Sequence, residues 1–503
     1  MEQEPQPPGA ADPPAGPPAD AAALRRAERK LAPRLLPVVA LSALLASLNR
    51  SATALASVEL TAALGLSPTA YALGVSLFCV PYCLLQVPSQ MAMGAMRRQN
   101  LWLAALLVCW GATAASMAAV RTRWEFYAMR LLLGAFEAGA APGLWAYLAH
   151  FYSKERIVMP LAVMMGSLIL SQIIGPLLAA GLLAMGGVGG LRGWQWLFLI
   201  EGLSAVAVAF AWVFMPRDVE AVTALTPEEL AAVRASFAST QPPARGGNQL
   251  AVLRRALANP AVAAVSCIRF LRDAALYGLL AFMPLLLKNL MGLEAPGAEP
   301  VTKAQNVRIV LLIAAPFTAA VAAQFAIAWS SQRRGERRFH VAAAWGVGAA
   351  GLLALPFAIG TFGAAFACLS VALTGMVAGE GAAVAHFMAL QGGEKGVGLA
   401  IINSMGGVGE FVGPVVMGSL RERTGGYAAA LLVLAGLQAL AAVGVAALSP
   451  SRAERWARRE RGGATRGGGD GEAAAEPAAE AGLAGKKSVG GPSKSFVRVH
   501  VEA

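Results

Sequence analysis

Twelve apolar runs, each about as long as a membrane-spanning helix, constrain this chain more than any other feature. A transmembrane helix needs roughly 20 mostly apolar residues to cross the ~30 Å hydrocarbon core of a bilayer. The runs lie at 35–57, 69–93, 101–120, 124–150, 157–185, 193–215, 262–291, 305–330, 340–360, 362–388, 396–420 and 426–448. The pattern predicts an all-α membrane protein with twelve transmembrane helices, although 340–388 could be divided differently.

Composition supports this fold class and argues against others. The chain is 57% hydrophobic and 14% charged, whereas soluble domains are about 45–50% apolar and 25% charged. Its net charge is +12, but the basic residues lie between the apolar runs and in the tails, without the aromatic interleaving of a nucleic-acid surface. The five cysteines all fall in apolar runs without metal-ligand spacing. No enzyme motif is present, so we expect no enzyme, no metal, no cofactor and no nucleic-acid partner.

The spacing of the runs divides the chain into two halves. The basic loop 94–100 follows the second run and 330–338 follows the eighth, which indicates two pseudo-symmetric six-helix bundles. In the connection between them, Thr226 and Pro227 precede two acids, a typical helix start. The predicted parts are a disordered proline-rich cytosolic tail (1–30), the first bundle (31–215), a cytosolic linker (216–261), the second bundle (262–448) and a disordered cytosolic tail (449–503).

Loop charge predicts the orientation. A basic cluster at 25–34 precedes the first run, and the even-numbered connections carry more Lys and Arg than the odd-numbered ones. Arg421 and Arg423, in the last odd-numbered connection, are exceptions. Because basic loops stay in the cytosol, we expect both termini inside. The pattern leaves open whether the membrane is a plasma membrane or an organelle membrane.

Charged residues interrupt the first and fourth runs. Arg130 and Glu137 are seven apart in the fourth run and so share a helix face. Arg50 lies in the first run, and both arginines are about six residues, or roughly 9 Å, from the outer end of their helices. A charge at bilayer depth costs at least ~2.5–3.5 kcal/mol and usually lines a cavity or finds a partner.

Two interpretations of these charges remain open. The first is a structural pair of one arginine with Glu137 between packed helices. The second is a clamp of Arg50 and Arg130 facing a transport pathway, since guanidinium groups match carboxylate geometry. We favour the clamp, because two arginines and one glutamate leave a surplus positive charge for an anionic ligand.

Five segments carry a resemblance to a known family. The chain resembles the major facilitator superfamily and, within it, the anion:cation symporter family, whose bacterial and fungal members carry organic acids. The resemblance covers about residues 31–448. The segments that support it are YALGVSLFCVPYCLLQVPSQ (71–90), RLLLGAFEAGAAPG (130–143), GWQWLFLIEGL (193–203), LTPEEL (225–230) and LAIINSMGGVGEFVGPVVMGSL (399–420).

The resemblance implies a role for six matched positions. Arg50 and Arg130 would bind the substrate anion, Tyr82 would be an aromatic residue of the cavity, Gln172 and Asn403 would contact the substrate, and Glu137 would couple transport to protons. It implies the major facilitator fold, alternating access, and symport of a small organic anion with protons. The partners would be the substrate, protons and the lipid bilayer, with a monomer sufficient for function.

Departures from the family pattern put substrate and stoichiometry in question. Asn49 replaces an acid that family members carry before the arginine, and Glu410 adds an acid to the glycine-rich eleventh run. Arg269 and Arg272, with Asp273, match no family position. They form either Arg–Asp pairs near the inner mouth or extra anion affinity. The alternative functions are an anion uniporter or antiporter, and a receptor that binds without transporting.

Overall fold

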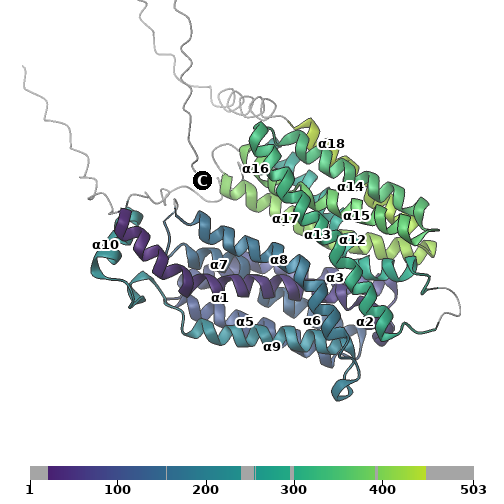
Figure 1. The fold of residues 1–503 in the computed structure, drawn as a ribbon, viewed down its shortest axis with the longest axis horizontal. Helices are drawn as coiled ribbons and strands as arrows, with labels where there is room; N and C mark the ends of the chain where they lie inside the picture. Colours follow the sequence, from purple (N-terminus) through teal and green to yellow (C-terminus); the bar gives the residue numbers. More distant parts are fainter. Residues whose placement is uncertain are drawn as a thin grey trace, which may run out of the picture. The chain divides into compact units, whose positions relative to one another are not determined.

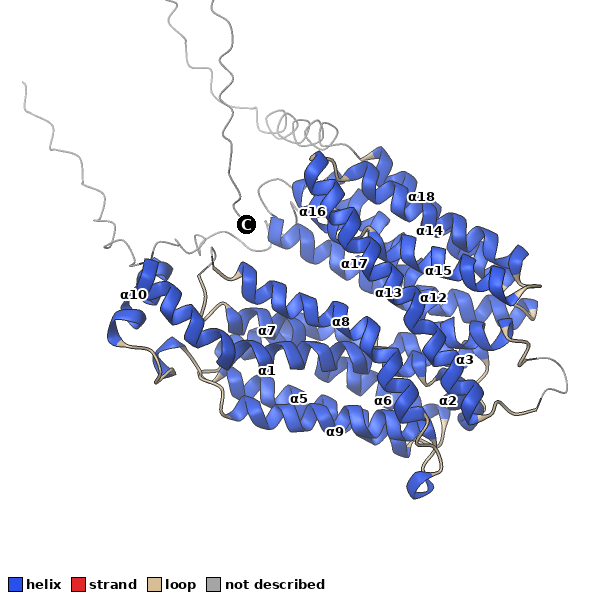
Figure 2. Cartoon of the chain, in the orientation of Figure 1, coloured by secondary structure: helices blue, strands red, loops and turns tan. Residues whose placement is uncertain are grey.

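The computed structural model describes residues 21–153, 156–238, 254, 257–294, 299–390 and 395–448. Within these ranges the chain forms helices and no strands (Figure 2). Eleven of the described helical segments are long and apolar enough to cross a membrane. The predicted run at 396–420 lies in a further helix, α17 (Lys395–Thr424), of 30 residues. The all-α membrane fold expected from the sequence is confirmed.

The helices fall into two groups that the linker separates (Figure 1). The N-terminal bundle contains α1 (Ala21–Leu55), α2 (Ser57–Leu64), α3 (Pro68–Leu77), α4 (Cys79–Ala95), α5 (Gln99–Ser116), α6 (Arg123–Glu137), α7 (Ala140–Leu148), α8 (Val158–Leu183) and α9 (Gly193–Val213). The linker contains α10 (Pro227–Ala238), and the C-terminal bundle contains α12 (Pro260–Leu290), α13 (Lys303–Arg334), α14 (Arg338–Ala358), α15 (Phe362–Ala378), α16 (Glu380–Leu390), α17 and α18 (Ala428–Ala447). Helix pairs α3–α4, α6–α7 and α15–α16 each form one broken span.

The two bundles repeat the same packing pattern. The first span packs on the fifth and sixth, as α1 on α8 and α9 and as α12 on α17 and α18. The third packs on the sixth, as α5 on α9 and α14 on α18, and the second packs on the fourth, as α3 on α6 and α13 on α15. The bundles meet where α8 lies against α13 and α3 against α17. This correspondence confirms the predicted pseudo-symmetry.

The start of α1 corrects one expectation. Residues 21–30, predicted as part of a disordered tail, are the first turns of this helix. Leu24, Ala27 and Leu31 recur at helical spacing and are buried. The polar side of these turns binds the linker helix, since Lys30 Nζ donates to Glu229 Oε2 at 2.7 Å. Thr226 caps α10 as predicted by accepting from the Glu229 N–H at 3.3 Å.

Hydrophobic side chains gather differently at the two ends of the bundles. We name the end at which α1 begins the inner end and the opposite end the outer end. One cluster of buried residues spans both bundles toward the outer end, including Tyr71, Phe126 and Phe282. Toward the inner end the bundles have separate clusters, built around Trp110 and Trp212 in one and around Trp345 and Phe387 in the other.

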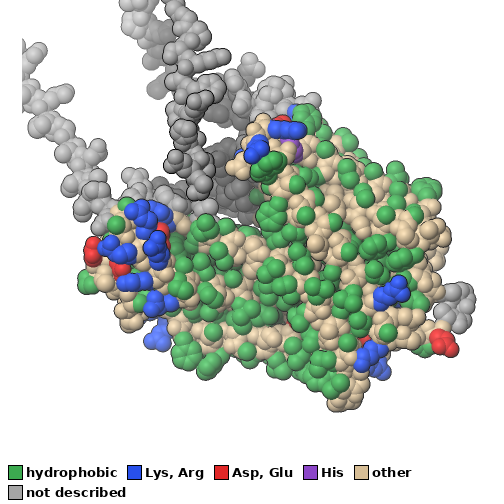
Figure 3. Space-filling view, in the orientation of Figure 1, with side chains coloured by type: hydrophobic (Ala, Val, Ile, Leu, Met, Phe, Trp, Pro, Cys, Tyr) green, Lys and Arg blue, Asp and Glu red, His purple; other side chains and the backbone are tan. Residues whose placement is uncertain are grey.

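Hydrogen bonds also join the bundles at the outer end. The Tyr71 hydroxyl donates to the Ala281 carbonyl at 2.9 Å, and Asn306 Nδ2 donates to Glu59 Oε1 at 2.7 Å. The inner ends of α8 and α17 lie apart in Figure 1. The outer end is therefore closed by packing between the bundles. Figure 3 shows apolar side chains over the middle of one face and basic side chains over α10 and the start of α1.

Candidate functional site

A buried ion pair links the first and fourth spans. Arg50 Nη2 lies 2.7 Å from Glu137 Oε1, and Arg50 Nε donates to the same oxygen at 3.2 Å. The Glu137 side chain is 1% exposed, whereas that of Arg50 is 31% exposed. The pairing that the sequence left open is thus made by Arg50, and its guanidinium keeps an open side.

Arg130 is held in a different way. It is buried and donates to the carbonyls of Gly74 and Val75, at 3.2 and 2.9 Å, and to Thr53 Oγ1 at 3.3 Å. The span formed by α3 and α4 breaks at Phe78, whose N–H bonds back to Ser76. Arg130 therefore bonds the carbonyls of the last turn before this break, where the regular helical ladder is interrupted.

Aromatic rings connect the two arginines. The guanidinium carbon of Arg50 lies 4.6 Å from the centre of the Tyr82 ring and 5.4 Å from that of Phe78. The corresponding carbon of Arg130 lies 4.8 Å from the Phe78 ring centre. Both cations thus lie next to one ring, that of Phe78, an arrangement in which each cation is attracted to the ring electrons. Arg50, Tyr82, Arg130 and Glu137 form one site, which we name the arginine site.

A glycine fixes the approach of the two helices that build this site. A Cβ at Gly134 of α6 would lie 2.1 Å from the Phe78 carbonyl oxygen of the break. Only glycine lets the backbones come this close. The sequence RLLLGAFE therefore places Arg130 and Glu137 against α3 and α4 and not merely on a buried face of α6.

The other sequence-predicted residues are placed less tightly. Gln172 of α8 donates to Ser47 Oγ at 3.3 Å, one turn before Arg50 on α1. Asn403 of α17 is exposed and two turns from Glu410 on the same helix. Asn49 is buried, and neither of its amide atoms has a hydrogen-bond partner among the described residues.

The unmatched arginines of the seventh span form a compact charge cluster. Arg269 Nε and Arg272 Nη1 each lie 2.6 Å from a carboxylate oxygen of Asp273. Both also contact Glu380 at the start of α16, with Arg272 Nη2 at 2.9 Å and Arg269 closer. Asp273 and the Arg272 side chain are almost completely buried. The charges of the two arginines and the two acids cancel. The structure thus contains the Arg–Asp pairs expected as one alternative from the sequence, and Glu380 is an additional partner. We name these four residues the α12 quartet.

Glu410 faces the N-terminal bundle from α17. Its Oε2 lies 3.8 Å from Cys79 Sγ on α4, a weak S–H donor. Arg50 of α1 is a neighbouring opposite charge, and Tyr277 of α12 is a hydrogen-bonding neighbour. Among the described ion pairs, none includes Glu410. The extra acid of the eleventh run therefore lies at the meeting of the two bundles, beside the arginine site.

Three residues at or beside the arginine site were not predicted from the sequence: Phe78, Thr53 and Cys79. Thr53 follows Arg50 by three residues on α1 and so shares its helix face, a spacing that was available in the sequence. Phe78 precedes Tyr82 by four, again one face of a helix. Cys79 had no such signal, because its role depends on the approach of α17.

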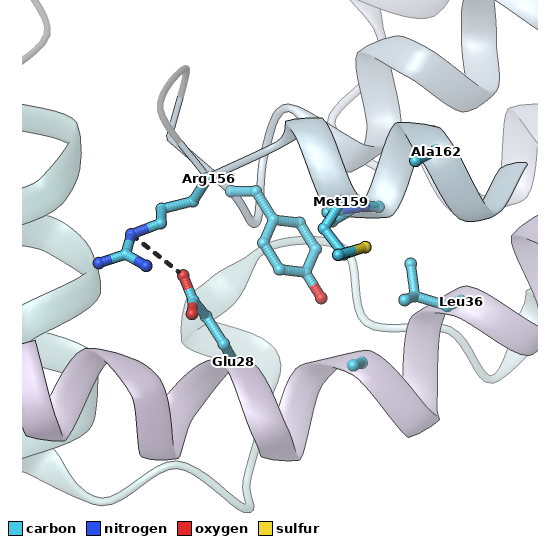
Figure 4. A pocket seen from close by; sticks show the side chains of 8 residues that line it. Glu28, Leu36, Arg156, Met159 and Ala162 are labelled. Atoms are coloured by element: carbon cyan, nitrogen blue, oxygen red, sulfur yellow. Dashed lines mark ion pairs between the residues drawn. The ribbon is translucent and has the colours of Figure 1, made fainter. Parts of the chain in front are cut away.

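A pocket at the inner end is separate from this site. It has a volume of about 440 Å³ and lies between α1 and the start of α8, lined by Glu28, Leu36, Tyr152 and Met159 among others (Figure 4). Arg156 Nε lies 3.6 Å from Glu28 Oε1 across its mouth. Glu28 is 22 residues from Arg50 on the same helix, about 33 Å away at ~1.5 Å per residue.

Comparisons with known proteins agree with this fold. A family model described as the Major Facilitator Superfamily matches residues 39–307. A protein of Agrobacterium vitis named for tartrate transport is 30% identical over 434 residues, covering 85% of this chain and 96% of the relative. The inner membrane transport protein RhmT of Escherichia coli is 30% identical, covering 83% and 94%.

Solved structures share the architecture at low identity. An inward-facing, unoccupied bacterial homolog of the human lysosomal transporter Spinster gives a TM-score of 0.64 at 15% identity, covering 85% of this chain and 97% of that one. A D-xylose–proton symporter gives 0.59 at 15% identity, covering 82% and 96%.

Proposed function

The chain belongs to the major facilitator superfamily of membrane transporters, and we propose that it carries a small organic anion together with protons. The observation that supports this most directly is the arginine site. Two guanidinium groups share the Phe78 ring, and Glu137 pairs with only one of them. One positive charge in this site is therefore left without a partner carboxylate, and an anion would compensate it.

The substrate would bind on the open side of Arg50. The Arg50 side chain is 31% exposed, and a guanidinium can donate two parallel hydrogen bonds to a carboxylate. Tyr82 stacks beside it. Gln172 of α8 donates to Ser47, one turn before Arg50, and Asn403 would approach from α17. Relatives named for tartrate transport favour a carboxylate substrate.

Glu137 supplies a route for proton coupling. It shares its counter-ion, Arg50, with the incoming anion. When the anion occupies Arg50, Glu137 loses its partner in a desolvated position, where the neutral form is favoured. When the anion leaves, the ion pair reforms and the proton is released. Net symport follows if the two events occur on opposite sides of the membrane.

Alternating access would come from motion between the bundles. The outer ends share a hydrophobic cluster and hydrogen bonds, whereas the inner ends have separate clusters. We infer an inward-facing state of a monomer whose termini are both cytosolic, as the loop charges predict. A transition to the outward-facing state would break the bond between Tyr71 and Ala281 and pack the inner ends together.

Conservative arginine variants test the anion site. Arg50→Lys and Arg130→Lys keep the charge but lose the two-pronged geometry. We expect each to lower uptake of radiolabelled tartrate by proteoliposomes roughly tenfold or more, since a hydrogen bond to a charged group is worth about 1.5–3 kcal/mol.

The matched control is Arg121→Lys in an exposed outer loop, where the backbone N–H of residue 121 donates to Glu125 Oε2 at 2.8 Å. It should leave uptake unchanged. If Arg50→Lys and Arg130→Lys are correctly inserted and both take up tartrate at the wild-type rate, the two arginines do not form an anion clamp.

A further inference from the structure

Glu410 is an acid between the bundles that the transport cycle described above does not use. It is partly exposed and lies in the middle of α17. Its carboxylate contacts α4 of the other bundle through Cys79 at 3.8 Å. A carboxylate at bilayer depth without an ion-pair partner costs at least ~2.5–3.5 kcal/mol on insertion scales, so it usually has a function or becomes neutral.

The charges in and around the arginine site indicate what that function could be. The α12 quartet contributes two positive and two negative charges and is neutral. Arg50 and Arg130 add two positive charges, and Glu137 and Glu410 add two negative ones. With every group ionised, Glu410 offsets the one positive charge that Glu137 leaves uncompensated on the arginine site, so the arginine site and Glu410 together have no net charge. Each acid that becomes neutral frees one positive charge.

The neighbours of Glu410 have opposing effects on the ionisation of its carboxyl. Arg50 of α1 and Arg269 of α12 favour the ionised form, whereas Asp273 of α12 and burial favour the neutral form. Tyr277 of α12 and Cys79 of α4 are the other titratable neighbours. The attraction to Arg50 crosses from one bundle to the other. Substrate binding at Arg50 and bundle separation would both weaken it.

We propose that Glu410 is a second proton-binding carboxyl of the transport site and that the substrate is a dianion. The proposal rests on the proposed function. A proton from solution binds the Glu410 carboxylate as the substrate takes over Arg50, and the proton leaves when the substrate does. With Glu137 and Glu410 both protonated, two uncompensated arginines match a dicarboxylate. One dianion and two protons then move without net charge.

The first span offers no second proton carrier beside Arg50. Asn49 cannot titrate, and its buried amide cannot replace a carboxylate as a proton carrier. The second carboxyl lies on the eleventh span, on the opposite bundle. Protonation of Glu410 would therefore depend on the distance between the bundles as well as on substrate binding.

Infrared difference spectroscopy tests the proton site without any substrate. Full-length protein in lipid is compared at mildly acidic and mildly alkaline pH, and the protonated-carboxyl band is recorded. We expect Glu410→Gln to remove one titrating carboxyl. Glu422→Gln, on the same helix at the exposed outer end, should not, since that carboxylate accepts from Ser67 and Thr69. A Glu410→Gln spectrum identical to the wild type would overturn the proposal.

Two further measurements keep the test decisive. If Glu410→Gln does not fold, Glu410→Asp must shift the titrating band, and an unshifted band overturns the proposal. In proteoliposomes, wild-type uptake of radiolabelled tartrate should not respond to a potassium–valinomycin potential, whereas Glu410→Gln uptake should. Equal sensitivity of both proteins would exclude the second proton. Absence of tartrate uptake in the wild type with a titrating Glu410 band would contradict the substrate class while leaving the proton site intact.

Discussion

The ion pair between Arg50 and Glu137 should respond unequally to loss of either partner. Arg50→Gln leaves a carboxylate that is 1% exposed without its cation. Removal of one member of a buried pair typically costs about 3–5 kcal/mol. Glu137→Gln instead leaves a guanidinium that is 31% exposed and stacked on Tyr82. It should cost only the charged hydrogen bonds, about 1.5–3 kcal/mol.

The double variant separates the pair from other effects. With glutamine at both positions no charge is stranded, so the double variant should be at least about 2 kcal/mol more stable than Arg50→Gln alone. The free energy of unfolding is measured by denaturant titration in detergent, followed by tryptophan fluorescence. Greater loss in Glu137→Gln than in Arg50→Gln, or losses that simply add in the double variant, would refute the reasoning.

Three further predictions concern packing, pH and topology. A Cβ at Gly413 of α17 would lie 2.1 Å from a backbone carbonyl oxygen of α12. Gly413→Leu should therefore force α12 and α17 apart and lower the thermal unfolding midpoint. Gly436→Leu should leave the midpoint unchanged, because no atom lies within 4 Å of a Cβ at that position. Lys30 of α1 and the Thr226 N–H hold the pKa of Glu229 below its usual value. Glu229→Gln should therefore lower the free energy of unfolding above about pH 4.3. This difference from the wild type should vanish as the pH falls through the lowered pKa of Glu229 in the folded protein. In intact cells an impermeant maleimide should label Val188→Cys above the parent background but not Glu228→Cys, and labelling of the latter without permeabilisation would invert the proposed orientation.

Length and polarity sufficed to predict the helices, because a bilayer admits few alternatives to long apolar helices. They were insufficient at the start of α1, where basic residues resemble a solvated tail. There the buried spacing of Leu24, Ala27 and Leu31 and the ion pairs to α10 decide the structure. Those partners are about 200 residues away and are invisible in the local pattern.

The arginine site shows the same division. Helix periodicity placed Arg130 and Glu137 on one face, but their shared helix favours no particular partner. In the folded protein Glu137 pairs with Arg50, whereas Arg130 donates hydrogen bonds to the carbonyls of Gly74 and Val75, just before the break at Phe78. The neighbours of Glu410 depend on the approach of α17 to α4 and α12, which the sequence of α17 alone does not specify.

The measurement that tests the central claim most directly compares accumulation and exchange in one variant. Proteoliposomes with wild-type protein or Glu137→Gln take up radiolabelled tartrate, either driven by an inside-alkaline pH gradient or in exchange for tartrate already inside. Exchange requires only the loaded carrier, whereas accumulation requires a proton to be released in each cycle. Proton-coupled anion transport through Glu137 predicts accumulation by the wild type. The variant should exchange at the wild-type rate but accumulate less, because it retains only the proton carried by Glu410. Concentrative uptake by Glu137→Gln at the wild-type level would contradict it.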